Sequence, residues 1–235
     1  MNDVVQGDCR ELLPEIVRNA ERPVIVTDPP FNVGYHYDVC ADRMSDGEYY
    51  TMLAKLFSGC PFVVIHYPEA LYRISHATGE IPRRVLSWVY NSNTPRQHRD
   101  CAYFGIEPCF DGLGEYKNPT DKRIAERIAA GEKAKGYDWL YCDQIKNVSK
   151  EKTEHPCQMP LAVMLYIVGS LPKDATIIDP FSGGGYNPSR RKAARTRLLR
   201  VRNLRELLPN HQESTSERHA AARCVRRRRV GIHHV

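Results

Sequence analysis

The stretch TDPPF, residues 27–31, combines side chains that could act on a bound ligand. Asp28 directly follows an apolar run and precedes Pro29, Pro30 and Phe31. Proline fixes φ and restricts the residue before it, so the segment predicts a rigid rim that holds a carboxylate beside an aromatic ring. If the apolar run is a strand, this rim lies at the carboxyl end of that strand, and open α/β folds bind ligands at the carboxyl edge of the sheet. An ordinary strand exit with a helix-breaking turn would use the same residues.

A second acid occupies a similar position later in the chain. Asp179 ends an apolar run and opens DPFSGGG, residues 179–185. Glycines allow backbone N–H groups to approach a ligand closely at the start of a following helix. Such a turn is weak evidence for cofactor binding when it stands alone. A third short motif, HPCQMP at residues 155–160, lies between the two acids.

The elements that position these residues follow from hydrophobic periodicity. Short apolar runs, typical of strands buried on both faces of a parallel sheet, alternate with amphipathic stretches that predict helices. We therefore predict a doubly wound α/β sheet. The predicted strands are 4–6, 23–28, 61–66, 83–90 and 175–178, and the predicted helices are 9–20, 45–58, 68–79, 120–130 and 159–171.

Two further structural expectations can be tested. The apolar helix at 159–171 is expected to bury Leu161, Met164, Leu165 and Val168. Residues 91–154 are polar and irregular, with one clear helix, and an irregular block of this size inside an α/β domain is uncommon unless it has a function. Its Trp139, like Trp88 before it, is expected in the core.

Composition excludes several classes of protein. No apolar run approaches the roughly 20 residues that a membrane helix needs, and the N-terminus lacks a signal pattern, so we expect a cytoplasmic protein. The eight cysteines show no metal-ligand spacing and are expected to be reduced thiols, with no metal site. The net charge of +6 is concentrated in residues 186–235, which carry +11, so residues 1–185 carry −5.

The three motifs, in this order, resemble the β-class of DNA amino-methyltransferases, in which the DPPY/F half precedes the cofactor half. The resemblance covers residues 4–185. It implies a Rossmann-like sheet of permuted order that binds S-adenosyl-L-methionine (SAM) and methylates the exocyclic N6 amine of an adenine flipped out of double-stranded DNA. DPPF favours adenine over the N4 amine of cytosine, because cytosine enzymes more often carry Ser in place of Asp28.

The resemblance also implies roles for individual residues. Asp28 and the carbonyl beside Pro29 would accept hydrogen bonds from the amine, within a rim completed by Pro30, and Phe31 would stack on the base. Asp8 matches a family acid that contacts the cofactor adenine, although a helix N-cap explains it equally well. Met159 replaces the usual lysine of HPxQKP. The cofactor-binding residues expected are Asp8, His155, Gln158, Asp179, Pro180, Phe181, Ser182, Gly183 and Gly185.

We therefore expect a catalytic half at 1–90, a target-recognition region with some framework at 91–154, a cofactor half at 155–185 and a basic tail at 186–235. The resemblance also implies a bacterial or phage restriction–modification setting, and it leaves open both a cognate restriction enzyme and a homodimer. Basic residues of the recognition region could contact DNA or be solvated surface; they are Arg96, Arg99, Lys117, Lys122 and Arg123.

The tail departs from the family pattern, which continues after Gly185 with paired threonines, a helix and a strand that ends in a ribose-binding acid. Residues 186–235 contain no Asp. A basic tail that binds nucleic acid is one interpretation. The interpretation we favour is a frameshift in the glycine codons, since reading the codons of residues 186–189 one base later can give Thr-Thr-Leu-Ala. The tail would then be out of frame and poorly ordered, and the chain an impaired remnant with nonspecific DNA binding.

Overall fold

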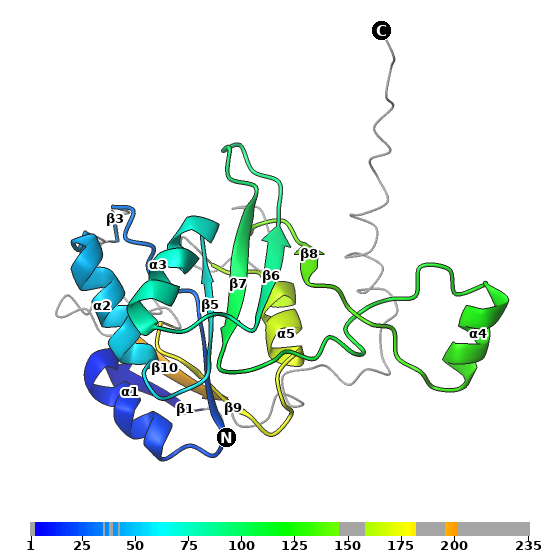
Figure 1. The fold of residues 1–235 in the computed structure, drawn as a ribbon, viewed down its shortest axis with the longest axis horizontal. Coiled ribbons are helices and arrows are strands. Elements are labelled where there is room, and N and C mark those ends of the chain that lie inside the picture. The colour runs from blue at the N-terminus through cyan, green and yellow to red at the C-terminus, as the bar shows by residue number, and fades with distance from the viewer. Residues whose placement is uncertain are drawn as a thin grey trace, which may run out of the picture. The chain divides into compact units, whose positions relative to one another are not determined.

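The computed structural model describes the backbone of residues 3–34, 36–37, 40–41, 43–145, 158–181 and 196–201, all within one compact unit, residues 1–203. Among these residues, eight strands form one sheet in the order β1-β10-β9-β2-β5-β7-β6-β8 (Figure 1). The strands are β1 (Asp3–Gly7), β2 (Pro23–Thr27), β5 (Phe62–His66), β6 (Arg84–Val89), β7 (His98–Phe104), β8 (Trp139–Tyr141), β9 (Thr176–Asp179) and β10 (Thr196–Val201).

The centre of the sheet is parallel. β2 pairs in parallel with β9 on one side and with β5 on the other. Of the eight strands described in this sheet, β7 and β10 run against the rest, because each is antiparallel to both of its neighbours. A short hairpin of β3 (His36–Tyr37) and β4 (Cys40–Ala41) follows β2. The predicted α/β class is confirmed, with a mixed sheet in place of a fully parallel one.

The helices begin and end where local chemistry predicts. They are α1 (Cys9–Arg18), α2 (Asp46–Phe57), α3 (Pro68–Thr78), α4 (Lys122–Ala129) and α5 (Leu161–Gly169). Ser45 caps α2 through a capping box with Glu48, which satisfies backbone N–H groups that lack partners within the helix. Gly79 ends α3 at φ 71°, a left-handed conformation that glycine adopts without steric cost.

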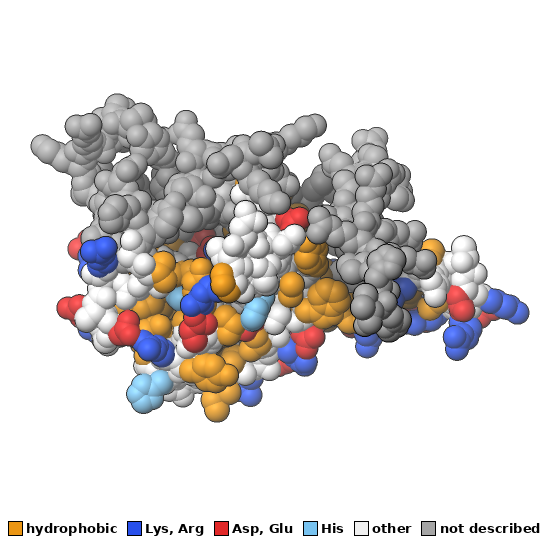
Figure 2. All heavy atoms as spheres, turned by 90° about the horizontal axis from the view of Figure 1, so that it is seen from above, with side chains coloured by type: hydrophobic (Ala, Val, Ile, Leu, Met, Phe, Trp, Pro, Cys, Tyr) orange, Lys and Arg blue, Asp and Glu red, His pale blue; other side chains and the backbone are white. Residues whose placement is uncertain are grey.

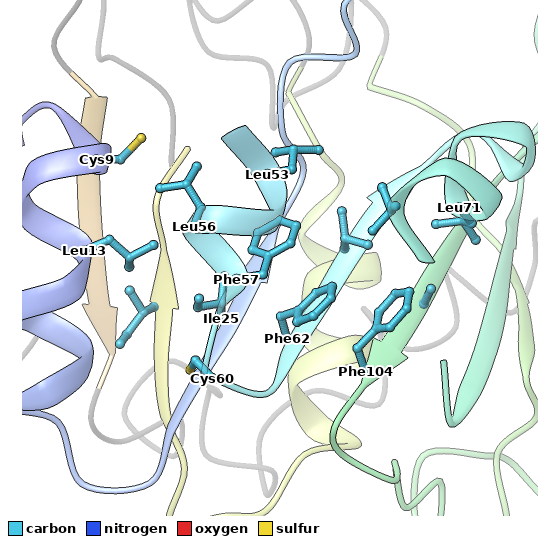
Figure 3. Close-up of a cluster of buried hydrophobic side chains, with 14 of the residues drawn as sticks. Cys9, Leu13, Ile25, Leu53, Leu56, Phe57, Cys60, Phe62, Leu71 and Phe104 are labelled. Atoms are coloured by element: carbon cyan, nitrogen blue, oxygen red, sulfur yellow. The ribbon is translucent and has the colours of Figure 1, made fainter. Parts of the chain in front are cut away.

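Helices α1, α2 and α3 share the face of the sheet that carries the main apolar cluster (Figure 3). Ile25 and Phe62 project into this cluster from β2 and β5, and Leu13 and Phe57 approach it from α1 and α2. Phe57, Phe62 and Phe104 stack in series, with ring centroids 4.4 Å apart in each pair. This cluster anchors the strands whose carboxyl ends form the site.

Helix α5 covers the opposite face. Tyr103 points away from the cluster that holds Phe104, and its hydroxyl lies 3.0 Å from Ser170 Oγ just after α5. The helix buries Val163 and Ile167, whereas Leu161 is 58% exposed. The predicted buried face of 159–171 is therefore wrong. Nearly every residue of α5 is apolar, so the sequence carries no period that selects a face.

The region 91–154 contributes more to the sheet than its composition predicts. Its strand β7 lies between β5 and β6, which the sequence did not predict, and the expected helix is α4. Trp88 is buried as expected, at 1% exposed. Trp139 was expected in the core but is 54% exposed, because it lies on the edge strand β8.

One segment of the basic tail also enters the sheet. Strand β10 pairs antiparallel with β1 and with β9. The segment therefore takes a position next to the strand that carries Asp179. None of the helices in the described ranges is long and apolar enough to cross a membrane.

Candidate active site

The two motif acids meet at one edge of the sheet. Val24 of β2 is paired with Ile177 of β9, so Asp28 and Asp179 follow or end neighbouring parallel strands at their carboxyl ends. Thr27 connects the two motifs, since its buried hydroxyl donates a hydrogen bond to Asp179 Oδ1 at 2.7 Å. The fold thus brings together TDPPF and the start of DPFSGGG, which lie about 150 residues apart in sequence.

Asp179 is held by two donors. Besides the Thr27 hydroxyl, the backbone N–H of Phe181 donates to Asp179 Oδ1 at 2.9 Å. Burial raises the pKa of Asp179 to about 6, and the two hydrogen bonds act against this increase because they favour the ionised form. Phe181 packs against the main apolar cluster, and the adjacent Pro180 is buried. This carboxylate therefore fixes the turn that leaves β9.

Asp28 has a different set of partners. Arg99 Nη1 of β7 lies 3.5 Å from Asp28 Oδ2, while Asp28 Oδ1 and Arg99 Nε are buried and find no hydrogen-bond partner among the described residues. The Asp28 side chain is 22% exposed. Burial raises the pKa of Asp28 to about 7; the Arg99 charge opposes this increase and the Asp179 charge adds to it. Among the described residues, Asp28 Oδ1 is thus able to accept a further hydrogen bond.

The Phe31 ring stands among other planar groups. It stacks on the His66 ring with centroids 4.3 Å apart and planes 29° apart, and it meets the Tyr67 ring edge-on at 4.8 Å. The Arg99 guanidinium also lies over Phe31, 4.7 Å from the ring centroid. Phe31 therefore leaves the Asp-Pro-Pro rim at a place already lined by aromatic and cationic groups.

His66 supports the Asp-Pro-Pro rim through a series of hydrogen bonds that ends at the Pro30 carbonyl. The backbone N–H of Tyr67 donates to His66 Nδ1 at 2.8 Å, so the neutral ring carries its proton on Nε2. Nε2 lies 3.1 Å from the Tyr49 hydroxyl, which donates to the Pro30 carbonyl at 2.6 Å. Burial lowers the pKa of His66 to about 4, with the Arg99 charge contributing, and so keeps the ring neutral.

The structure places Asp8 at the N-terminus of α1. Its carboxylate accepts a hydrogen bond from the backbone N–H of Arg10 at 2.9 Å and contacts the Arg10 side chain, with Nη2 2.5 Å from Oδ2. The side-chain hydrogen bond to Arg10 lowers the pKa of Asp8. Asp8 thus makes the N-cap contacts that one of its two interpretations predicts.

The other expected cofactor residues are described only in part. Gln158 lies in the described segment just before α5, which begins after Pro160. The remaining expected residues lie outside the described ranges, and they are His155, Ser182, Gly183 and Gly185.

The candidate DNA-binding residues divide into one largely enclosed residue and four exposed ones. Arg99 belongs to the site itself, at 14% exposed. Arg96 pairs with Glu69 near the rim. The other three lie in the recognition region, where basic side chains gather over α4 at the right of Figure 2, and they are Lys117, Lys122 and Arg123.

Sequence reasoning did not identify His66, Tyr49 and Tyr67 as parts of the site. A usable signal was present for His66, a polar residue that ends the apolar strand PFVVIH next to β2. Carboxyl ends of adjacent parallel strands meet at one edge, so a polar residue in that position is a candidate. Tyr49 reaches the site only through the packing of α2, which no local pattern encodes.

No family model matches the chain, and no curated protein matches it. Solved structures similar to it include a crystal structure of an M1.HpyAVI–SAM complex, with 18% sequence identity and a TM-score of 0.44 over 76% of this chain and 81% of that chain. Another is a crystal structure of M1.HpyAVI, with 16% identity and a TM-score of 0.43 over 76% of this chain and 80% of that chain.

Proposed function

We propose that this chain is a SAM-dependent DNA methyltransferase that acts on the exocyclic N6 amine of an adenine flipped out of the duplex. The observation that carries the proposal is Asp28, whose buried Oδ1 has no hydrogen-bond donor among the described residues, at the sheet edge shared with Asp179. An exocyclic amine supplies the missing N–H group. Phe31, which follows on the same rim, supplies a ring near the expected position of a base.

The chemistry of the edge fits a cationic methyl donor. The buried carboxyls of Asp28 and Asp179 both have a raised pKa, and the Asp179 charge raises the pKa of Asp28 further. A positive charge bound near two such carboxylates favours their ionised forms. SAM, when bound, supplies a sulfonium with a methyl group open to nucleophilic attack. The residues proposed to hold it are Asp8, His155, Gln158, Asp179, Pro180, Phe181, Ser182, Gly183 and Gly185.

The proposed role of the rim is to make a poor nucleophile reactive. The lone pair of an exocyclic amine is delocalised into its ring. Asp28 accepts a hydrogen bond from the amine, the carbonyl beside Pro29 accepts another, and the nitrogen becomes more tetrahedral with its lone pair directed at the methyl group. Orientation and proximity then supply much of the rate. Ionised Asp28 can take the proton that the amine loses.

Cytosine is the second candidate substrate. Its N4 amine presents the same N–H donors to Asp28 as the N6 amine of adenine.

The recognition region is proposed to contact the duplex around the flipped base. Its residues proposed for this contact are Lys117, Lys122, Arg123 and the exposed pair Tyr137 and Trp139. A homodimer and a cognate restriction enzyme remain part of the proposal.

A third candidate is an impaired remnant, and the direction of β10 favours it. Strands that are joined through a helix in a doubly wound sheet run parallel. β10 instead runs antiparallel to β9, although it lies where the family pattern expects the next parallel strand. This orientation is consistent with residues 186–235 being read out of frame.

One set of experiments separates these candidates. The chain as written and a version with the glycine codons restored to the alternative frame are incubated with SAM and DNA, and the nucleosides are identified by mass spectrometry. N6-methyladenine supports the first candidate and N4-methylcytosine the second. Calorimetry with SAM tests the third, since binding by the restored version alone indicates a remnant. The absence of both products with both versions would contradict the proposed enzyme.

A further inference from the structure

Arg99 is the most enclosed cation in the site, and a phosphate contact does not explain its surroundings. Its side chain is 14% exposed and projects from β7 toward the Asp-Pro-Pro rim. The guanidinium carbon lies 5.4 Å from the centroid of the Trp88 ring and 5.9 Å from that of Tyr67. An arginine meant for a DNA phosphate is normally exposed. Arg99 instead lies inside the acceptor half of the site.

Two of its contacts are those that the proposed function assigns to the target base. The guanidinium lies over Phe31, 4.7 Å from the ring centroid, as a stacked base would. Nη1 lies 3.5 Å from Asp28 Oδ2, where the base would present its amine. A guanidinium is planar and carries N–H donors along its edge, so it resembles the amine edge of a base in both respects.

The Phe31 ring, on which a base would stack, is contacted by both His66 and Arg99. His66 is paired with Asp100 across β5 and β7, so Arg99 is one residue out of step with it and projects from the other face of the sheet. His66 and Arg99 therefore reach Phe31 from opposite faces of the sheet, and both contact its ring. While Arg99 is in place, its guanidinium covers part of the ring on which a base would stack.

We propose that Arg99 is a placeholder for the target base: its guanidinium occupies the place between Phe31 and Asp28 in the free protein and withdraws when the base enters. This inference rests on the proposed function, because it takes the Asp28–Phe31 rim as the acceptor site.

The contact between Arg99 and Asp28 is long enough for an entering donor to replace it, while Tyr90 also interacts with the Arg99 side chain. A separation of 3.5 Å is longer than an ordinary N–H···O hydrogen bond, and both Asp28 Oδ1 and Arg99 Nε are buried without a partner among the described residues. An entering amine can donate to Asp28 directly, so it makes a bond that Arg99 does not. Trp88 lies close to the guanidinium and provides a surface on which the cation can remain.

The test measures binding of a free base, without methyl transfer. The full chain is titrated with 9-ethyladenine by calorimetry at pH 8.5, where Asp28 is ionised in the presence of Arg99. Arg99→Ala is expected to bind 9-ethyladenine roughly tenfold more tightly than the wild type, because a competing cation–π contact has been removed. Arg84→Ala is the matched control, since Arg84 pairs with Glu107 and Asp138 on the surface and should leave the affinity unchanged.

Two further variants and a second ligand test whether the gain in 9-ethyladenine affinity comes from the Phe31 ring and the amine of the base. Phe31→Ala combined with Arg99→Ala should lose the gain, and 1-methylthymine, which lacks an amine, should show none with Arg99→Ala. Arg99→Met repeats the measurement with most of the side-chain volume retained, and circular dichroism verifies the fold of each variant. Equal or weaker adenine binding by both folded Arg99 variants would overturn the proposal, as would a gain that persists without Phe31.

SAM calorimetry on the same proteins keeps the two proposals separate. If the wild type binds SAM and the Arg99 variants bind 9-ethyladenine no more tightly than the wild type does, the placeholder proposal is wrong and the methyltransferase proposal stands. If the Arg99 variants gain adenine binding while no version transfers a methyl group, the rim is a base site and the proposed reaction is wrong.

Discussion

Asp28 and Asp179 lie at the ends of neighbouring parallel strands, and burial raises the pKa of both, yet they differ in their partners. Asp179 accepts hydrogen bonds from Thr27 and from the backbone of Phe181. Asp28 has a cation 3.5 Å from one oxygen, and its other oxygen has no donor in the part of the chain that the structure describes. The difference indicates that Asp179 holds a turn in place, whereas Asp28 is arranged to receive a donor from a ligand.

The largest expected effect is on catalysis. Asp28→Asn keeps the shape of the side chain but removes the charge that accepts from the amine and takes its proton. We expect methyl transfer to fall by about 10²- to 10⁴-fold, with SAM affinity changed little. Single-turnover transfer of labelled methyl groups to DNA measures the first quantity and calorimetry the second. A variant that retains more than a tenth of the activity would contradict the role of Asp28.

The second effect is a dependence on pH. In the folded protein Asp28 keeps its proton up to a pH of about 7, whereas its usual pKa is 3.8. Between these values the folded state binds more protons than the unfolded chain, so the free energy of unfolding falls as pH rises, by at most about 1.4 kcal/mol per unit of pKa shift. Activity should rise as Asp28 ionises through pH 7.

Denaturant unfolding of the wild type and of Asp28→Asn between pH 4 and 8 isolates this contribution. Buried neutral His66, with a pKa of about 4, acts in the opposite direction, because the unfolded chain gains a proton below its usual pKa of 6.5. His66 is present in both proteins and cancels in their difference. A difference that does not change with pH would show that Asp28 has an ordinary pKa.

The third effect is on stability and concerns Asp179, the acid whose carboxylate accepts two hydrogen bonds. Asp179→Ala leaves the buried Thr27 hydroxyl and the Phe181 N–H without their acceptor. We expect the free energy of unfolding to fall by about 1–3 kcal/mol. Asp174→Ala is the control, because the side-chain contact described for Asp174 is an exposed ion pair with Arg22, and surface pairs of this kind contribute about 0–1 kcal/mol. Equal effects of the two substitutions would remove the distinction between the acids.

The smallest effect concerns the support of the rim. Tyr49→Phe removes the hydroxyl that links His66 to the Pro30 carbonyl. We expect a loss of about 0.5–1.5 kcal/mol in the free energy of unfolding. The matched variant Tyr50→Phe alters a neighbouring, half-buried tyrosine of the same helix, and it should change the stability less. A larger loss from Tyr50→Phe would show that the relay contributes little.

Much of the acceptor half could be predicted from the sequence. The apolar run before Asp28 predicted a buried parallel strand, and the predicted helices 45–58 and 68–79 agree closely with α2 (Asp46–Phe57) and α3 (Pro68–Thr78). The meeting of Asp28 with Asp179 follows from the rule that parallel strands end at one edge. These features depend on local residue types, so the local sequence contains enough information.

Other features depend on contacts between distant segments. β7 begins with polar residues, and only its antiparallel pairing with β5 and β6 makes it a strand of the sheet. The buried face of α5 is chosen by neighbours such as Tyr103, because the helix is apolar all round. Arg99 looked like one of several surface cations. Its burial beside Asp28 results from the register of β7, which the sequence does not encode locally.

The position of β10 between β1 and β9 has a consequence for the order in which the molecule can fold. β1 lies near the start of the chain, and its described partner strand, β10, lies near residue 200. During synthesis β1 emerges before β10, so its pairing edge has to wait until the whole segment between the two strands has been made. Contacts this distant in sequence slow folding and leave an unpaired strand exposed for longer. A shift in reading frame after the glycine turn would therefore alter the partner of a strand made well before the shifted codons.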